Sequence, residues 1–214
     1  AFVPLRTDHN RPLMDTSNPV QFGEVLFPDF YPDYELKKHR ALADSDRVIK
    51  RVFDEYATVS GRQYGLIDCY DTQDADIILV GIGSMMQTAR ATLPMLAARG
   101  DKVGIINLRA FRPFPSAEVA EAVKNARVVC VLDRDIGYGT SGMVYPDFTR
   151  TLFHQRQRPD LLNFIIGTGG KDITPQTIAR CVELGRPGYT GQAVFWPDAR
   201  GADEGPAYTP ELMA

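Results

Sequence analysis

Between residues 77 and 185, short apolar runs alternate with longer amphipathic segments, and this alternation constrains the fold more than any other feature of the chain. Runs such as IILVGIG and RVVCVLD have the length and the continuous hydrophobicity of strands that are buried on both faces of a sheet. The segments between them have the length and apolar spacing of helices. The pattern predicts an α/β fold with three layers: a mostly parallel sheet, right-handed crossovers and helices on both faces.

The same pattern sets the expected boundaries of the helices and strands. The expected strands are 77–83, 102–111, 127–133 and 161–170, and the expected helices are 84–100, 116–126, 141–155 and 174–185. The third of these helices should begin after Pro146 or kink there, because proline lacks the N–H that a helix interior needs. The fourth has Pro175 at its first position and Gly185 as its stop signal.

The two ends of the chain differ from this central region. Residues 1–35 are rich in proline and aromatic residues, a composition that does not sustain a helix or a central strand, so we expect an extended arm there. Residues 45–61 have the apolar spacing of one amphipathic helix, which Ser45 or Asp46 can cap and Gly61 can end.

These segments divide the chain into three expected parts. Residues 1–74 comprise the arm, the amphipathic helix and a linker. Residues 75–188 form the α/β domain. Residues 189–214 return to proline, glycine and aromatic residues and are expected to form an irregular tail that lies on another surface.

Composition excludes several classes of protein. The net charge of −3 and the isoelectric point near 5.6 argue against a nucleic-acid-binding surface. Cys69, Cys130 and Cys181 stand too far apart for a zinc or iron–sulfur motif, and their odd number does not fit a disulfide framework. The longest apolar runs reach about half of the ~20 residues that cross a bilayer. We therefore expect a cytoplasmic protein in a reducing compartment, with no membrane partner.

Charged side chains cluster where the expected parallel strands end, at the edge where open α/β sheets place ligands and contacts. The segment NLRAFRPFP follows one strand with Arg109 and Arg112, LDRDIGYGTSG follows another with Asp133 and Arg134, and GTGGKDITP offers Lys171. Arginine stays charged at any working pH, so Arg109 and Arg112 suit an interface or an anion contact better than proton transfer. A structural ion pair or an ordinary turn is the simpler explanation for each.

No residue of the sequence is assigned as catalytic, cofactor-binding or metal-binding. The turn GIGSMM lacks the third glycine of a dinucleotide-binding loop, since Met86 stands in its place. The three histidines have neither metal-ligand spacing nor an obvious nucleophile partner, and no hydrolase or Walker motif is present.

Several motifs taken together resemble one family. GRQYG at 61–65, GS at 83–84, RPFP at 112–115, DR at 133–134 and GGKDIT at 169–174 occur in the order found in the alpha chain of the 2-oxoacid:ferredoxin oxidoreductases, which include pyruvate synthases. The resemblance covers nearly the whole chain. It implies that the α/β domain is similar to the C-terminal domain of transketolase.

The resemblance also implies a function and a set of cofactors. Family enzymes cleave a 2-oxoacid on thiamine diphosphate with Mg²⁺, pass electrons through [4Fe–4S] clusters to ferredoxin or a similar acceptor, and transfer the acyl group to coenzyme A. The thiamine-pyrimidine domain of the complete alpha chain has no counterpart here. The cofactors are therefore expected on other domains or on the thiamine-binding and iron–sulfur chains of a multi-subunit complex, with none bound by this chain alone.

This resemblance favours a structural and docking part of the alpha subunit. A stand-alone α/β ligand-binding or regulatory module without catalysis is the alternative. A flavodoxin-like electron carrier is a weaker one, because only Ser84 represents the hydroxyl-rich phosphate loop such a carrier needs. The substrate stays open among pyruvate, 2-oxoglutarate, oxalate, branched-chain and aryl 2-oxoacids. Within the RPFP segment, we expect Arg112 to pair with Asp133, with Asp135 or with a carboxylate of a neighbouring domain.

Overall fold

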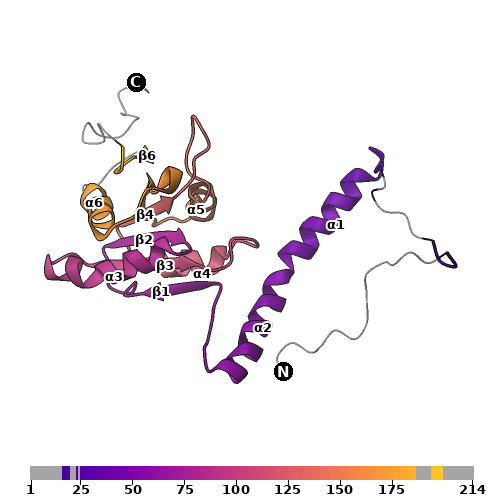
Figure 1. Ribbon diagram of the computed structural model, residues 1–214, viewed down its shortest axis with the longest axis horizontal. Helices are drawn as coiled ribbons and strands as arrows, with labels where there is room; N and C mark the ends of the chain where they lie inside the picture. The colour runs from indigo at the N-terminus through magenta and orange to yellow at the C-terminus, as the bar shows by residue number, and fades with distance from the viewer. Residues whose placement is uncertain (1–15, 20–22, 24, 187–193, 200–214) are drawn as a thin grey trace. The chain divides into compact units, whose positions relative to one another are not determined.

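The computed structural model of the protein describes residues 16–19, 23, 25–186 and 194–199. The chain divides into two compact units, Ala1–Tyr64 and Gly65–Ala214. The first unit contains two helices and short irregular segments in its described residues, and the second is an α/β unit (Figure 1).

The α/β unit contains a six-stranded sheet in its described residues. The strands are β1 (Ile67–Tyr70), β2 (Ile77–Ile82), β3 (Val103–Leu108), β4 (Val128–Asp133), β5 (Asp160–Ile165) and β6 (Val194–Phe195). Their order across the sheet is β1-β3-β2-β4-β5-β6. The pairs from β3 to β6 are parallel, and β1 runs antiparallel to β3 at one edge.

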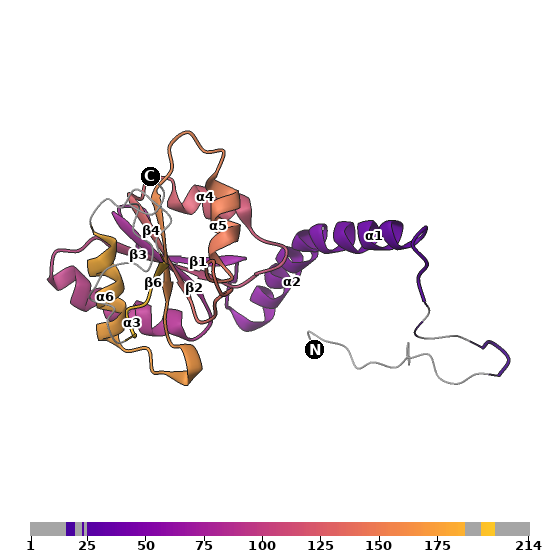
Figure 2. The same cartoon turned by 90° about the horizontal axis from the view of Figure 1, so that it is seen from above.

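Two pairs of helices cover the sheet and make three layers (Figure 2). The helices are α3 (Met85–Ala98), α4 (Ser116–Val123), α5 (Tyr145–Leu152) and α6 (Pro175–Gly185), and η1 (Thr168–Gly170) is a single 3-10 turn. Buried side chains of α3 and α6 share one core cluster with one face of the sheet, and those of α4 and α5 share a second cluster with the other face. The predicted three-layer, mostly parallel α/β fold is confirmed.

The strands read as continuous apolar runs because both of their faces are buried. In β2, Leu79 belongs to the α3–α6 core, whereas Ile78 and Val80 belong to the α4–α5 core, and all three are fully buried. Successive strand side chains point to opposite faces, so a strand between two helical layers needs apolar residues at every position. Each such side chain contributes roughly 1.5–3 kcal/mol through burial.

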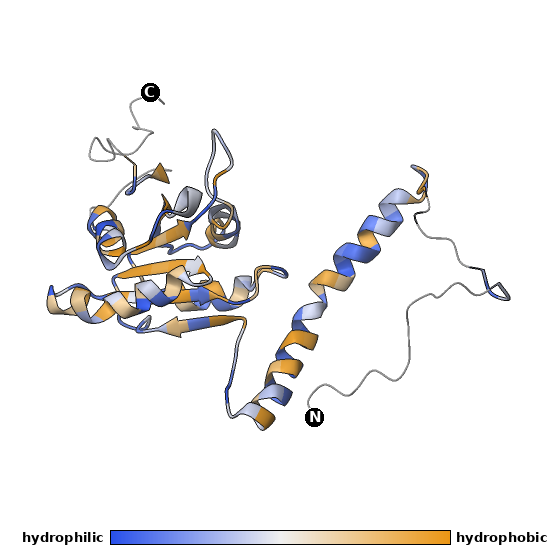
Figure 3. Cartoon of the chain, in the orientation of Figure 1, coloured by the Kyte–Doolittle hydropathy of each residue, from blue (hydrophilic) through white to orange (hydrophobic). Residues whose placement is uncertain are grey.

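The helical unit contains α1 (Tyr31–Ala43) and α2 (Ser45–Ser60). The prediction of a helix ending before Gly61 is confirmed: Gly61 has φ 68° in the left-handed region, and its N–H donates to the Ala57 carbonyl. One side of α2 carries an apolar stripe (Figure 3). Tyr56 of α2 stacks on Tyr64 with ring centres 5.8 Å apart. The predicted capping is wrong, because Asp44 is the N-cap residue and the Ser45 hydroxyl donates instead to the Leu42 carbonyl at 2.7 Å.

Other segments also differ from the sequence-based expectation. Helix α1 begins at Tyr31, inside the range expected to be extended, because Pro32 lies in its first turn, where a missing N–H costs no helical hydrogen bond. Strand β1 lies in the expected linker, and β6 lies in the expected irregular tail. Residues 1–15, 187–193 and 200–214, which hold much of the predicted arm and tail, lie outside the described residues.

Candidate functional site

The charged residues singled out in the sequence lie at the carboxyl edge of the sheet, with Asp133 at the end of β4 and the others in the loops that follow β3, β4 and β5. Arg109 follows β3 directly and forms an ion pair with Asp68 on β1. In the antiparallel ladder Asp68 lies opposite Asn107, two residues before Arg109. This ion pair therefore links the edge strand to its neighbour.

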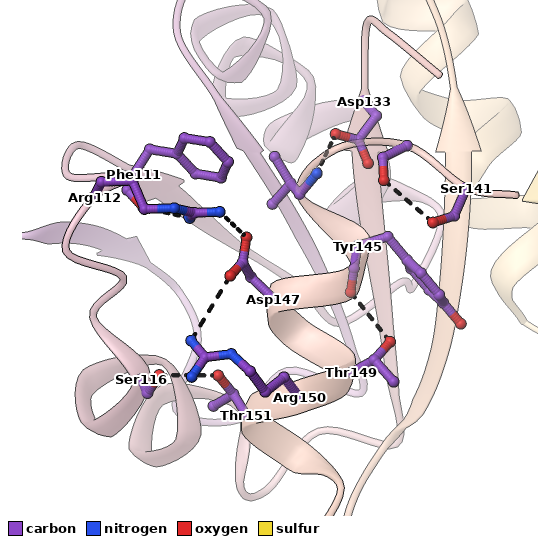
Figure 4. Close-up of polar contacts among 12 residues, drawn as sticks. Phe111, Arg112, Ser116, Asp133, Ser141, Tyr145, Asp147, Thr149, Arg150 and Thr151 are labelled. Carbon is purple, nitrogen blue, oxygen red and sulfur yellow. Dashed lines mark hydrogen bonds and ion pairs between the residues drawn. The ribbon is translucent and has the colours of Figure 1, made fainter. Parts of the chain in front are cut away.

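Arg112 lies at the centre of a cluster between the RPFP segment and α5 (Figure 4). Its guanidinium donates to the Asp147 carboxylate at 2.9 Å and to the Phe111 carbonyl at 2.7 Å. The guanidinium also lies over the Phe111 ring, 4.0 Å from the ring centre. Arg150, one turn along α5, contacts the other oxygen of Asp147 at 3.7 Å. Two arginines therefore share one carboxylate.

The predicted pairing of Arg112 with Asp133 or Asp135 is wrong. Asp133 is buried at the end of β4, where it accepts hydrogen bonds from the Val144 backbone N–H and the Asn163 side-chain amide, both at 2.9 Å. The Asp135 carboxylate accepts instead from the Ile136 backbone N–H at 2.8 Å. Shared location at one sheet edge was therefore not enough to predict the partner, because backbone donors of its own loop satisfy each acid first.

Burial of Asp133 has an electrostatic consequence. Desolvation raises the pKa of its carboxyl group above the ordinary value, and hydrogen bonds from the loop and from Asn163 counteract this only in part. Asn163 also donates to the Val131 carbonyl at 3.2 Å and accepts from the Gly142 N–H at 2.7 Å. A Cβ at position 142 would overlap the Asp133 carboxylate, so glycine is needed there.

This polar network holds the base of the loop between β4 and α5. Closer to its tip, the Gly137 N–H donates to the Ser141 carbonyl at 3.0 Å and the Thr140 N–H donates to the Gly137 carbonyl at 3.0 Å. Tyr138 stands at the tip with 96% of its surface exposed. A buried network thus supports a loop that presents an aromatic side chain to its surroundings.

Arg134 contacts the turn that follows β5, and Lys171 contacts the segment that follows β6. The Lys171 ammonium donates to the Asp198 carbonyl at 2.5 Å, and the Asp198 carboxylate accepts from the Gly167 N–H at 2.9 Å. Arg134 donates to the Gly167 carbonyl at 3.3 Å. Both cations therefore stabilise the turn after β5. In the described residues, none of these contacts links them to the Arg112 cluster.

Sequence reasoning missed three residues that contact the predicted site residues or their loops: Asp147, Asn163 and Asp198. Asn163 left a signal, because it is the polar interruption of the buried run LLNFII. Asp147 left none, since an acid in the first turn of a helix normally lies in solvent and favours the helix dipole. Asp198 lies in the expected tail, whose path the sequence pattern does not predict.

Comparison with known proteins shows which family the α/β domain resembles. A family model for the pyruvate:ferredoxin oxidoreductase core domain II matches residues 75–178. The chain is 36% identical over 170 residues to pyruvate synthase subunit PorA of Methanothermobacter thermautotrophicus, which covers 79% of this chain and 43% of the relative. It is 33% identical over 172 residues to ketoisovalerate oxidoreductase subunit VorA of Pyrococcus abyssi, covering 80% of this chain and 44% of the relative.

Residues 75–178 belong to the pyruvate:ferredoxin oxidoreductase core domain II family, and the chain is similar to alpha subunits of the 2-oxoacid:ferredoxin oxidoreductases. It spans less than half the length of these two curated relatives. Among solved structures, it is similar to a 2-oxoglutarate:ferredoxin oxidoreductase from Magnetococcus marinus, with 19% identity, a TM-score of 0.42, and coverage of 66% of this chain and 23% of that chain.

The described residues of this chain do not fit an iron–sulfur cluster, which typically needs four cysteine thiolates in one place. Cys69 is exposed on β1, whereas Cys130 and Cys181 are buried in the sheet and in α6. In the part of the chain that the structure describes, no group of three or more His, Cys, Asp or Glu side chains could hold a metal ion. No reaction step is therefore assigned to these residues. No described helix is long and apolar enough to cross a membrane.

Proposed function

We propose that this chain is part of the alpha subunit of a thiamine diphosphate- and iron–sulfur-dependent 2-oxoacid:ferredoxin oxidoreductase. The complex would convert a 2-oxoacid to acyl-CoA and CO2, or run the reverse reaction. The observation that carries the proposal is the 36% identity to a pyruvate synthase subunit over 79% of this chain. The matched family domain, residues 75–178, includes four strands of the sheet and its carboxyl-edge loops.

Within that complex, the role proposed for this chain is structural and concerns docking. The charged residues of the carboxyl edge make pairs and backbone contacts: Arg109 with Asp68, Arg112 with Asp147, and Lys171 with the Asp198 carbonyl. The guanidinium groups of Arg109 and Arg112 do not exchange protons at working pH, so their pairs fix the loops of this edge and do not serve as acids or bases. Arg109, Arg112, Asp133, Arg134 and Lys171 are proposed as interface or loop-fixing residues.

The cofactors are proposed to lie on other domains or chains. Thiamine diphosphate with Mg²⁺, [4Fe–4S] clusters and coenzyme A would be bound by the thiamine-binding and iron–sulfur subunits, and ferredoxin or a similar acceptor would receive the electrons. The two relatives named above act, by their names, on different 2-oxoacids, and their identities to this chain are close, at 36% and 33%. The substrate is therefore proposed only as a 2-oxoacid.

Purification from the native source tests this function. The tagged full chain should bring down thiamine-binding and iron–sulfur subunits, identified by mass spectrometry. The purified complex should reduce a viologen dye in the presence of coenzyme A and one of pyruvate, 3-methyl-2-oxobutanoate or 2-oxoglutarate. A chain that purifies alone and binds coenzyme A, a nucleotide or an acidic metabolite to saturation would instead support the stand-alone binding module.

A further inference from the structure

Two arginines that share one carboxylate leave a positive charge without a partner in the Arg112 cluster. Figure 4 shows the Arg112 and Arg150 guanidiniums directed at opposite oxygens of Asp147. Among the described residues, Asp147 is the one acid that pairs with either arginine. The cluster therefore has two positive charges and one negative charge, on a chain whose net charge is −3.

The two cations are accessible, whereas the acid is not. The side chains of Arg112 and Arg150 are 48% and 66% exposed, and that of Asp147 is 11% exposed. An arginine has five N–H donors. The Nη2 atom of Arg112 donates to Asp147 and its Nη1 atom donates to the Phe111 carbonyl, so the remaining N–H donors of this half-exposed side chain can face solvent. Asp147 is thus the buried part of the cluster, and the two arginines are the part that faces solvent.

Arg112 is held in place before any partner arrives. The Phe111 ring lies under its guanidinium, and the hydrogen bonds to Phe111 and Asp147 fix the plane of the group. A side chain that is already ordered loses less entropy when it binds. Phe153 follows Arg150 by three residues, at the C-cap of α5, and is 63% exposed. Exposed arginine and aromatic side chains are the residue types most enriched among strong contacts of protein interfaces.

We propose that Arg112 and Arg150 receive a carboxylate from an Asp or Glu side chain of another subunit of the oxidoreductase complex. This inference rests on the proposed function and names the chemistry of the partner. One added carboxylate makes the cluster neutral, with two cations and two anions. A phosphate dianion would leave excess negative charge beside the poorly solvated Asp147, which disfavours it.

A carboxylate that belongs to a partner protein fits better than a free one. The arginines are exposed, and water and salt weaken an isolated ion pair at such a surface. A carboxylate carried on a docked subunit is presented at high effective concentration, so the same pair can then form. The cluster therefore contributes to assembly and selects an acidic partner surface.

The test measures association of the full chain with the subunits that co-purify with it. Arg112→Gln and Arg150→Gln keep a polar side chain but remove the charge, and Arg127→Gln removes an exposed arginine just before β4, at the opposite edge of the sheet. At low salt, we expect Arg150→Gln to weaken association up to about 5-fold and the double variant more, since exposed charge pairs act at this scale. High salt should reduce the difference, and Arg127→Gln should match the wild type.

The results that would contradict the carboxylate contact can be distinguished from those that would contradict the proposed function. Unfolding midpoints of each variant, measured alone, show whether a variant is merely unstable. If the wild-type chain associates with no subunit, the proposed function fails as well. If folded Arg112→Gln and Arg150→Gln chains assemble like the wild type, only the carboxylate contact is wrong. If the wild-type chain binds succinate to saturation, and the variants lose that binding but still assemble normally, the cluster is a small-anion site and the docking inference is rejected.

Discussion

At the scale of single residues, exposure decides how much each charged contact stabilises the fold. Arg112 is half exposed, so its pair with Asp147 is screened by water, and exposed ion pairs typically contribute about 1 kcal/mol or less. Asp147 is mostly buried, contacts two cations and lies in the first turn of α5, where an acid is favourable. The acid should therefore matter more to stability than either arginine.

Substitution of these residues tests that ranking. Arg112→Ala should lower the free energy of unfolding by about 1 kcal/mol or less, and Asp147→Ala by about 1–3 kcal/mol, because hydrogen bonds to charged groups are the stronger ones. Urea titration of the full chain measures both values, with Arg150→Ala as the control at a more exposed site. A larger loss of stability for Arg112→Ala than for Asp147→Ala would contradict this ranking.

Titration of the buried Asp133 should make the stability of the fold depend on pH. Burial raises its folded-state pKa above the unfolded value. The folded chain therefore favours the protonated carboxyl group. The contribution of this group to the free energy of unfolding is fully present below the unfolded-state pKa and is lost as pH rises through the raised folded-state pKa. The free energy of unfolding of the wild type should therefore fall relative to Asp133→Asn as pH rises across this window, starting from about 4.

The test compares how the free energy of unfolding changes with pH in the two proteins, and not its absolute value. An asparagine at position 133 would place its NH2 group against one of the two N–H groups that now donate to the carboxylate, and this clash lowers stability at every pH. Asp135→Asn is the control, since Asp135 is exposed in the same loop. Equal pH slopes for the wild type and Asp133→Asn would contradict the predicted titration.

At the scale of elements, the loop between β4 and α5 depends on a buried amide. Asn163 bonds to the Val131 carbonyl, the Asp133 carboxylate and the Gly142 N–H. Asn163→Leu keeps a similar volume but leaves these buried groups without their partner, at roughly 1–3 kcal/mol for each group left unsatisfied. We expect amide hydrogen exchange to rise across 134–144 while α3 and α6 keep their protection. Ser141→Ala, which removes a weaker local contact at 3.2 Å, should change exchange little. Uniform acceleration across the sheet would show that the amide supports the whole core instead.

The elements also show where sequence reasoning succeeds. The four central strands and the four helices that cover them were predicted because each has a recognisable pattern of apolar residues in its own sequence: a continuous run in a strand and helical spacing in a helix. Strand β1 has four residues and β6 has two, so neither is long enough to show a pattern of apolar residues that identifies a strand. They exist through pairing with β3 and β5 and, for β6, through the stack of Phe195 on Phe164 at 4.9 Å. The Arg112–Asp147 contact was missed for the same reason, since it joins residues 35 positions apart.

At the scale of the whole molecule, apolar side chains are distributed unevenly between the two units. The large apolar side chains that are exposed lie mainly at residues 25–59, whereas in the described residues of the α/β unit they are Ile82, Tyr138, Met143 and Phe153. Neither α1 nor α2 contains a buried residue, although α2 has a clear apolar stripe (Figure 3). The α/β unit has two buried cores and the helical unit has none of comparable size in its described part, so the two should differ in local stability.

Limited proteolysis tests this difference. In the isolated full chain, we expect cleavage within residues 25–64 first and a long-lived fragment that begins near Gly65, because opening a helix without buried residues costs little free energy. In the assembled complex, cleavage there should slow, since burial of the apolar stripe against another chain would stabilise α2. Mass spectrometry of time points locates the cuts, and cleavage after Lys124, a residue exposed at the end of α4 in the α/β unit, serves as the internal reference. If α2 in the isolated chain resists protease as long as β4 does, the helical unit is already covered within the chain, and its apolar stripe is then part of the chain's own core.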